Sequence, residues 1–85
     1  MSLMLKGMLY EAENELKSKT EELKRTIEEI NRLKVFTFKG EYGFYDCQLW
    51  LGSLKRAVDR ASICAEEIKE LLEKINHIKT SLKEE

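Results

Sequence analysis

The chain has 85 residues, which is enough for one small domain and too few for a two-domain enzyme with a cleft between its lobes. It contains no proline and four glycines, while 36% of its residues are charged, and this mixture excludes a disordered tail, a collagen-like chain and an all-β fold rich in turns. Fifteen basic and sixteen acidic residues leave a net charge of −1, with neither sign gathered into a block. We therefore expect no nucleic-acid and no membrane partner.

The segment from about residue 4 to residue 34 carries a seven-residue apolar repeat, which predicts one long helix. Its a positions are Leu9, Leu16, Leu23 and Ile30, and its d positions are Leu5, Ala12, Lys19, Thr26 and Leu33, so the stripe is small or polar in the middle. Acidic residues precede basic ones by four positions, as Glu15 precedes Lys19, and such pairs stabilise a helix.

The segment from about residue 46 to residue 83 predicts a second helix with a wider apolar face. Its a positions are Leu51, Val58, Ala65, Leu72 and Lys79, its d positions are Cys47, Leu54, Ala61, Ile68, Ile75 and Leu82, and its g positions are Trp50, Ala57, Cys64, Leu71 and Ile78. A face of three adjacent apolar positions is too wide for one partner helix and suits two. Asp46 is predicted to cap the N-terminus of this helix.

The connector at about 35–45 holds five aromatic residues, which are Phe36, Phe38, Tyr42, Phe44 and Tyr45. Apolar residues alternate with others on both sides of Gly40, and this pattern favours a short β-hairpin. An irregular loop or an extension of a helix remains the alternative. We expect these aromatic side chains to be the surface that contacts another protein.

Two helices and one connector predict a single domain, an all-α antiparallel two-helix hairpin. Because such a hairpin leaves part of the second helix exposed, we expect it to dimerise into a four-helix bundle with the second helix at the centre. The predicted dimer core consists of Trp50, Leu54, Val58, Ala61, Ala65, Ile68, Leu72 and Ile75. The pattern leaves open whether the dimer is parallel or antiparallel.

Small residues form a patch in the middle of the second helix, at Ala57, Ala61, Cys64 and Ala65. In one interpretation the two copies of the second helix cross at this patch. In the other, the patch receives bulky residues such as Leu16 or Leu23 from the first helix of the same chain. Under both interpretations, Ala61→Glu should disrupt the core.

No residue pattern predicts catalysis, a metal site or a cofactor. His77 falls opposite the apolar stripe, and the two cysteines, Cys47 and Cys64, are seventeen residues apart with no C-x-x-C motif. Lys55, Arg56 and Arg60 form a small basic cluster, but Asp59 lies inside it. We therefore predict a protein that is not an enzyme and has no small-molecule substrate.

The sequence lacks the features of membrane and secretory proteins. No stretch approaches eighteen consecutive apolar residues, and no basic segment precedes an apolar run of signal-peptide length. These observations predict a cytoplasmic protein.

The tripeptide Trp50-Leu51-Gly52 lies in a chain of two long helical segments, and in this respect the chain resembles the small WXG family of secreted helical hairpins. The resemblance implies a dimer that is exported without a cleavable signal, with Trp50 and Gly52 in the turn between the helices. It also implies a Y-x-x-x-[DE] export signal in the C-terminal tail. The only such match here runs from Tyr42 to Asp46, ahead of the tripeptide.

The order helix, short β-hairpin, helix is similar to that of prefoldin-type chaperones. That resemblance implies that the hairpin strands assemble subunits and that the helix tips hold unfolded proteins. Both resemblances imply a protein that is not an enzyme. We predict a self-associating scaffold, adaptor or accessory subunit, with a chaperone or a secreted hairpin as the alternatives.

Overall fold

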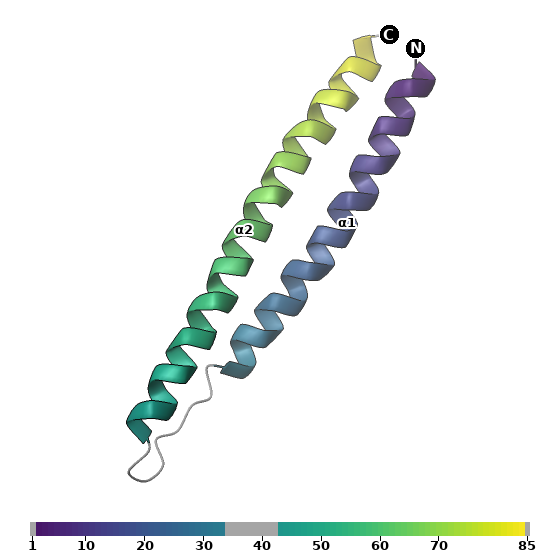
Figure 1. Ribbon diagram of the computed structural model, residues 1–85. Helices are drawn as coiled ribbons and strands as arrows, with labels where there is room; N and C mark the ends of the chain where they lie inside the picture. The colour runs from purple at the N-terminus through teal and green to yellow at the C-terminus, as the bar shows by residue number, and fades with distance from the viewer. Residues whose placement is uncertain (1, 34–42, 85) are drawn as a thin grey trace.

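The computed structural model describes residues 2–33 and 43–84, and each of these ranges is one α-helix. Helix α1 is Ser2–Leu33 and helix α2 is Gly43–Glu84. The two helices lie side by side and run in opposite directions, so that the start of α1 is next to the end of α2 (Figure 1). The two described ranges contain no strand, which confirms the predicted helical hairpin.

The start of α2 differs from the prediction. The helix begins at Gly43, three residues before Asp46, so Asp46 lies within the first turn and the prediction that it caps the helix is wrong. The first four N–H groups of a helix have no partner inside the helix, and poor helix formers therefore cost little there. Phe44 and Tyr45 are helical, so the predicted β-hairpin does not extend to them. Phe36, Phe38 and Tyr42 lie outside the described residues.

Helix α2 turns its g positions toward α1. Ala57 and Cys64 are 0% and 2% exposed, and Leu71 and Ile78 are also buried. On α1 the buried residues are Ala12 and Thr26, both at d positions. The distance between two packed helices depends on the side chains at the contact, and these short side chains allow a close approach. Small residues therefore form the contact at Ala12, Thr26, Ala57 and Cys64, and large aliphatic residues form it at Leu71, Ile75 and Ile78.

The a positions of α2 remain outside this contact. Leu51, Val58 and Leu72 are 50%, 44% and 51% exposed, and Ala65 is exposed as well. The d positions between the two rows are half-buried from Leu54 to Ile68 and buried at Ile75. One helix therefore covers only part of the three-position face of α2.

The hairpin is long and thin. Its Cα atoms extend over 68 × 14 × 13 Å, and their radius of gyration is 19.5 Å. A compact domain of this length would have a radius of gyration of about 12 Å. Within residues 2–33 and 43–84 no second layer covers the two helices, so the faces that they do not turn toward each other meet solvent unless another chain packs there.

Candidate functional site

One face of the hairpin carries the ion pairs that connect α1 to α2. Lys19 Nζ lies 2.6 Å from Glu67 Oε2, and Arg60 Nη2 donates a hydrogen bond to Glu29 Oε2 at 2.8 Å. Further charged residues flank these pairs. Glu15 and Lys74 line one shallow depression together with Glu67. We call this surface the paired face; it consists of Glu15, Lys19, Glu29, Arg60, Glu67 and Lys74.

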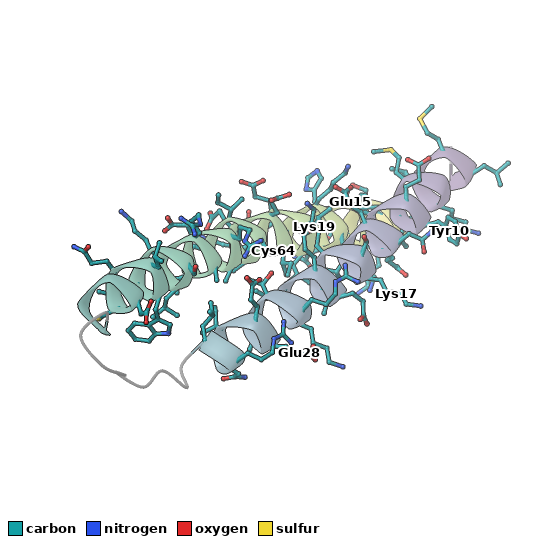
Figure 2. The ribbon with its side chains drawn as sticks, turned by 60° about the horizontal axis from the view of Figure 1, so that its bottom comes forward. Tyr10, Glu15, Lys17, Lys19, Glu28 and Cys64 are labelled. Atoms are coloured by element: carbon teal, nitrogen blue, oxygen red, sulfur yellow. The ribbon has the colours of Figure 1, made fainter. Side chains whose placement is uncertain are left out.

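Cys64 lies beneath the Lys19–Glu67 pair. Its Sγ donates a hydrogen bond to the Lys19 carbonyl oxygen at 3.1 Å, and Figure 2 shows the side chain between the two helices. Burial raises the pKa of the Cys64 thiol, and the nearby Glu22 carboxylate acts in the same direction. The hydrogen bond with Glu67 raises the pKa of Lys19. Both groups therefore keep their protons, and neither is prepared to act as a nucleophile or a base.

The opposite face of the hairpin is apolar along most of its length. Leu16 and Thr20 of α1 line a groove of about 470 Å³ together with Leu72 and Ile75 of α2. Charged residues stand around this groove, namely Glu13, Lys17, Glu21 and Lys79. The groove therefore has an apolar floor and a charged rim.

A second groove continues from Thr20 along α1. It is lined by Leu23 and Ile27, with Lys24 and Glu28 beside them. On α2, residues seven apart share one side of the helix, so Leu51, Val58 and Ala65 follow Leu72 along the same face. We call this surface the apolar face; it consists of Leu16, Thr20, Leu23 and Ile27 of α1 with Leu51, Val58, Ala65 and Leu72 of α2.

The residues predicted for the dimer core fall into three groups. Val58, Ala65 and Leu72 are exposed on the apolar face, and Leu54, Ala61 and Ile68 are half-buried between that face and α1. Ile75 is buried within the hairpin. In the patch of small residues, Ala57 and Cys64 face α1 of the same chain, whereas Ala65 does not.

Trp50 connects the two helices near the end of α1. Its indole Nε1 donates a hydrogen bond to the Leu33 carbonyl oxygen. The last four carbonyl groups of a helix have no partner within the helix, so this bond satisfies one of them. Trp50 and Gly52 both lie inside α2, not in the turn that the WXG resemblance implies for them.

Sequence reasoning on the dimer core missed the contribution of α1. Leu16, Thr20, Leu23 and Ile27 complete the apolar face, yet they were absent from the predicted core. The sequence does contain one sign of this contribution, which is Ile27. This residue lies beside the heptad stripe and not on it, and it is 46% exposed in the hairpin. A large apolar residue on the flank of a stripe indicates that the stripe serves more than one partner.

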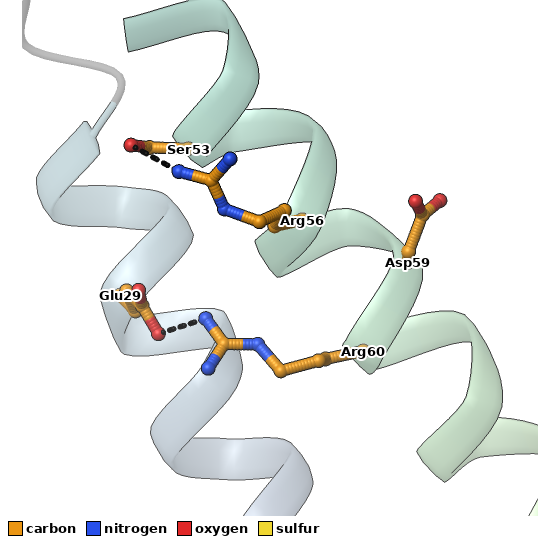
Figure 3. Close-up of a pocket in the computed structure, with 5 residues that line it drawn as sticks. All are labelled: Glu29, Ser53, Arg56, Asp59 and Arg60. Carbon is orange, nitrogen blue, oxygen red and sulfur yellow. Dashed lines mark hydrogen bonds and ion pairs between the residues drawn. The ribbon is translucent and has the colours of Figure 1, made fainter. Parts of the chain in front are cut away.

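A small pocket between α1 and α2 has the mixed charge that the sequence indicated. It is lined by Glu29, Ser53, Arg56, Asp59 and Arg60. Figure 3 shows Arg60 reaching to Glu29 of α1 and Arg56 bending back to Ser53, whose hydroxyl oxygen accepts its hydrogen bond at 3.3 Å. The two guanidinium groups share the pocket with two carboxylates, so its charges balance and an anion gains little there.

The remaining side chains that could take part in catalysis or bind a metal lie far apart from one another. His77 is exposed on α2, and Cys47 is a half-buried free thiol. Within residues 2–33 and 43–84, no three His, Cys, Asp or Glu side chains come together as metal ligands would. Neither described helix has an apolar stretch of the length and hydropathy needed to cross a membrane.

Comparisons of the chain with models of protein families, with curated proteins and with solved structures found no match.

Proposed function

We propose that the protein is a self-associating helical hairpin that acts through protein–protein contacts, as a scaffold, adaptor or accessory subunit, and not as an enzyme. Two copies would cover each other's apolar faces and form a four-helix bundle. The observation that carries the proposal is the contrast between the two long faces of the hairpin. One bears the interhelical ion pairs, and the other bears exposed leucine, isoleucine and valine side chains.

The positions of the charges support a second helical layer over one face only. On the paired face, Lys19 and Arg60 reach across to acidic residues of the other helix and need no further partner. On the apolar face, Ile27, Val58 and Leu72 are about half exposed in a single chain. Burying such side chains stabilises an assembly by roughly 25 cal/mol for each Å² removed from water.

The surface area of the chain is consistent with a dimer. One copy exposes 6870 Å², whereas a compact monomer of 10.0 kDa would expose about 5,200 Å². The difference of about 1,600 Å² exceeds the roughly 800 Å² that each partner buries in an interface of standard size. One copy therefore has enough surplus surface for a stable contact.

The chemistry of the described residues supports a role without catalysis. The buried thiol of Cys64 has a raised pKa and a hydrogen bond to backbone, as a structural cysteine does. His77 is exposed on the outer side of α2, and Lys19 is occupied by Glu67. A catalytic nucleophile needs a base within hydrogen-bond reach, and these groups do not supply one to each other.

Sedimentation equilibrium over a wide range of concentration, combined with helical circular dichroism, tests the proposal. We expect a mass of two chains at high concentration, with dissociation on dilution. Val58→Lys and Leu72→Lys each place an ammonium group on the apolar face, and each should raise the dimer dissociation constant at least tenfold. A wild-type chain that stays monomeric and fully helical at every concentration would refute the proposal.

Ile63→Lys is the matched control for the two lysine variants. Ile63, like Val58 and Leu72, is an exposed aliphatic residue of α2, and its side chain is 62% exposed. It lies on the side of the helix away from both α1 and the apolar face. We expect this variant to dimerise like the wild type. An equal loss of dimer in all three variants would mean that added charge, and not the apolar face, controls association.

A chaperone that holds unfolded proteins is the second candidate, because one end of the hairpin exposes apolar side chains. Leu3, Met4 and Tyr10 are 69–85% exposed in the first three turns of α1, and Met8 is 40% exposed. Such a cluster suits transient contact with unfolded chains. The test is whether the protein suppresses aggregation of a heat-unfolded model enzyme, and whether Met4→Ser with Met8→Ser abolishes that effect while Ile63→Ser does not.

A further inference from the structure

We infer that the second copy lies end over end on the apolar face, so that each α2 packs antiparallel against the partner's α2 around a two-fold axis at the level of Ala65 and Thr20. The inference rests on the proposed function, since it specifies how the two copies meet. It concerns the orientation of the dimer, which the heptad pattern alone leaves open.

Two arrangements bring the apolar faces of two hairpins together with two-fold symmetry. If the axis runs along the helices, each α2 covers the partner's α1, and the same ends of both hairpins lie together. If the axis runs across the helices, each α2 covers the partner's α2, and opposite ends lie together. In both cases the same patch is used twice, as a symmetric dimer requires.

Contacts within the hairpin show which residues share a level along its length. Lys19 meets Glu67 and Cys64, and Glu29 meets Arg60. In each of these contacts the two residue numbers sum to between 83 and 89, so Thr20 of α1 lies at the level of Ala65 of α2. These two small, exposed residues therefore lie at one level within the apolar face.

The two large side chains of the α2 row nearest to Ala65 are placed symmetrically about it. Val58 and Leu72 each lie seven residues from Ala65, one on either side, and all three are exposed. An axis across the helices at Ala65 places Val58 of one copy on Leu72 of the other, and alanine on alanine. The two helices can approach closely at the axis and pack large side chains on both sides of it.

Lysines at one end of the apolar face oppose the alternative arrangement. Lys79 continues the a positions of α2 beyond Leu72, and Lys6 lies on α1 fourteen residues before Thr20, at the same level as Lys79. An axis along the helices would gather these two ammonium groups and their two copies at one level, which is repulsive. An axis across the helices instead places Lys79 near the partner's Leu51, where its aliphatic stem can cover the leucine.

Disulfide trapping tests the orientation in a Cys47→Ser chain, where the remaining native thiol, Cys64, is buried between the helices. Ala65→Cys and Thr20→Cys are made separately in this chain, oxidised alone and as a mixture, and the covalent dimers are identified by intact mass. We expect each variant to link to itself, and the mixture to yield few links between residue 20 and residue 65. The Cys47→Ser chain and its Ile63→Cys variant are the blanks, and each should form at least tenfold less covalent dimer.

Sedimentation of the unoxidised variants separates the two ways in which the inference can fail. If they are dimers and the link between residues 20 and 65 dominates the mixture, the axis runs along the helices and the inference is wrong, while the proposed function stands. If they and the wild type are monomers at every concentration, the proposed function is wrong and the inference falls with it. Dimers that link 65 to 65 and 20 to 20 support both.

Discussion

Cys64 is buried in the contact between the two helices. Its side chain is 2% exposed, and its Sγ donates a hydrogen bond to the Lys19 carbonyl oxygen. Burial disfavours the charged thiolate and raises the pKa of the thiol above its ordinary value of 9.0. Cys64 therefore acts as a small apolar residue, which agrees with the chemical role that its heptad position indicates.

The stability of the hairpin should consequently fall at alkaline pH. The unfolded chain loses the Cys64 proton at about pH 9, whereas the folded chain keeps it to a higher pH. The contribution of Cys64 to the free energy of unfolding is therefore constant below that pH and decreases above it. Lys19, with a pKa raised above 10.5 mainly by its hydrogen bond with Glu67, acts in the same direction but only above that value.

The measurement is urea unfolding by circular dichroism between about pH 7 and about pH 10, at one protein concentration. Cys64→Ala removes the titrating thiol, so its stability should decrease less over the upper part of this range than that of the parent. Parallel curves for the variant and the parent would show that Cys64 does not contribute to the pH dependence.

Trp50 contributes to stability through its indole N–H group. Trp50→Phe keeps an aromatic ring but removes the donor to the Leu33 carbonyl oxygen, and we expect a loss of about 1 kcal/mol in the free energy of unfolding. Leu49→Ala, at the exposed neighbouring position, should change it by less than about 0.5 kcal/mol. Equal effects of the two substitutions in urea unfolding would contradict a specific role for the indole.

At the residue level, the heptad pattern predicts the side of a helix on which a residue lies but not its partner on the other helix. The pattern pairs Lys19 with Glu15 along α1, whereas the structure pairs it with Glu22 and Glu67. It assigns Trp50 to an apolar core, whereas the structure adds a bond to Leu33. The contacts with Glu67 and Leu33 depend on how the two helices are placed lengthwise, which no single helix encodes.

At the level of the elements, the rotation of α2 about its own axis decides which of its side chains contact α1 and which lie exposed on the apolar face. The sequence predicts that its apolar face is too wide for one helix, and the structure agrees, since the g positions are buried and the a positions are exposed. Which of the two rows turns toward α1 was not predicted. The small residues Ala57 and Cys64 at the g positions match the small middle of α1, and this match favours the observed rotation.

Substitution of Ala57 by leucine tests this account of the rotation. Ala57 is fully buried against α1, so Ala57→Leu overfills the contact and should lower the free energy of unfolding by about 1–3 kcal/mol. Glu66→Leu introduces the same side chain at an exposed position of α2 and serves as the control. A stability of Ala57→Leu equal to that of the control in urea unfolding would mean that α2 is rotated differently.

At the level of the whole molecule, the hairpin is a rod, and its length determines most of its radius of gyration. The Cα atoms extend over 68 Å in one direction and over 14 and 13 Å in the other two. The antiparallel arrangement of two helices was predictable, because two long heptad segments joined by a short connector leave few alternatives. The association of the rods was a prediction as well, and the exposed a positions of α2 give that prediction a defined surface.

The shape of the rod yields a prediction that separates side-by-side association from other kinds. Packed helices lie about 8–10 Å apart, so two hairpins joined face to face shift each centre of mass by only about 5 Å from the common centre. The radius of gyration of the Cα atoms should then rise from 19.5 Å to about 20 Å while the mass doubles. Two rods joined at their ends would instead roughly double it. Small-angle X-ray scattering on a sample of known mass measures this radius, and a dimer with a radius near twice that of the single hairpin would exclude the apolar face as the site of association.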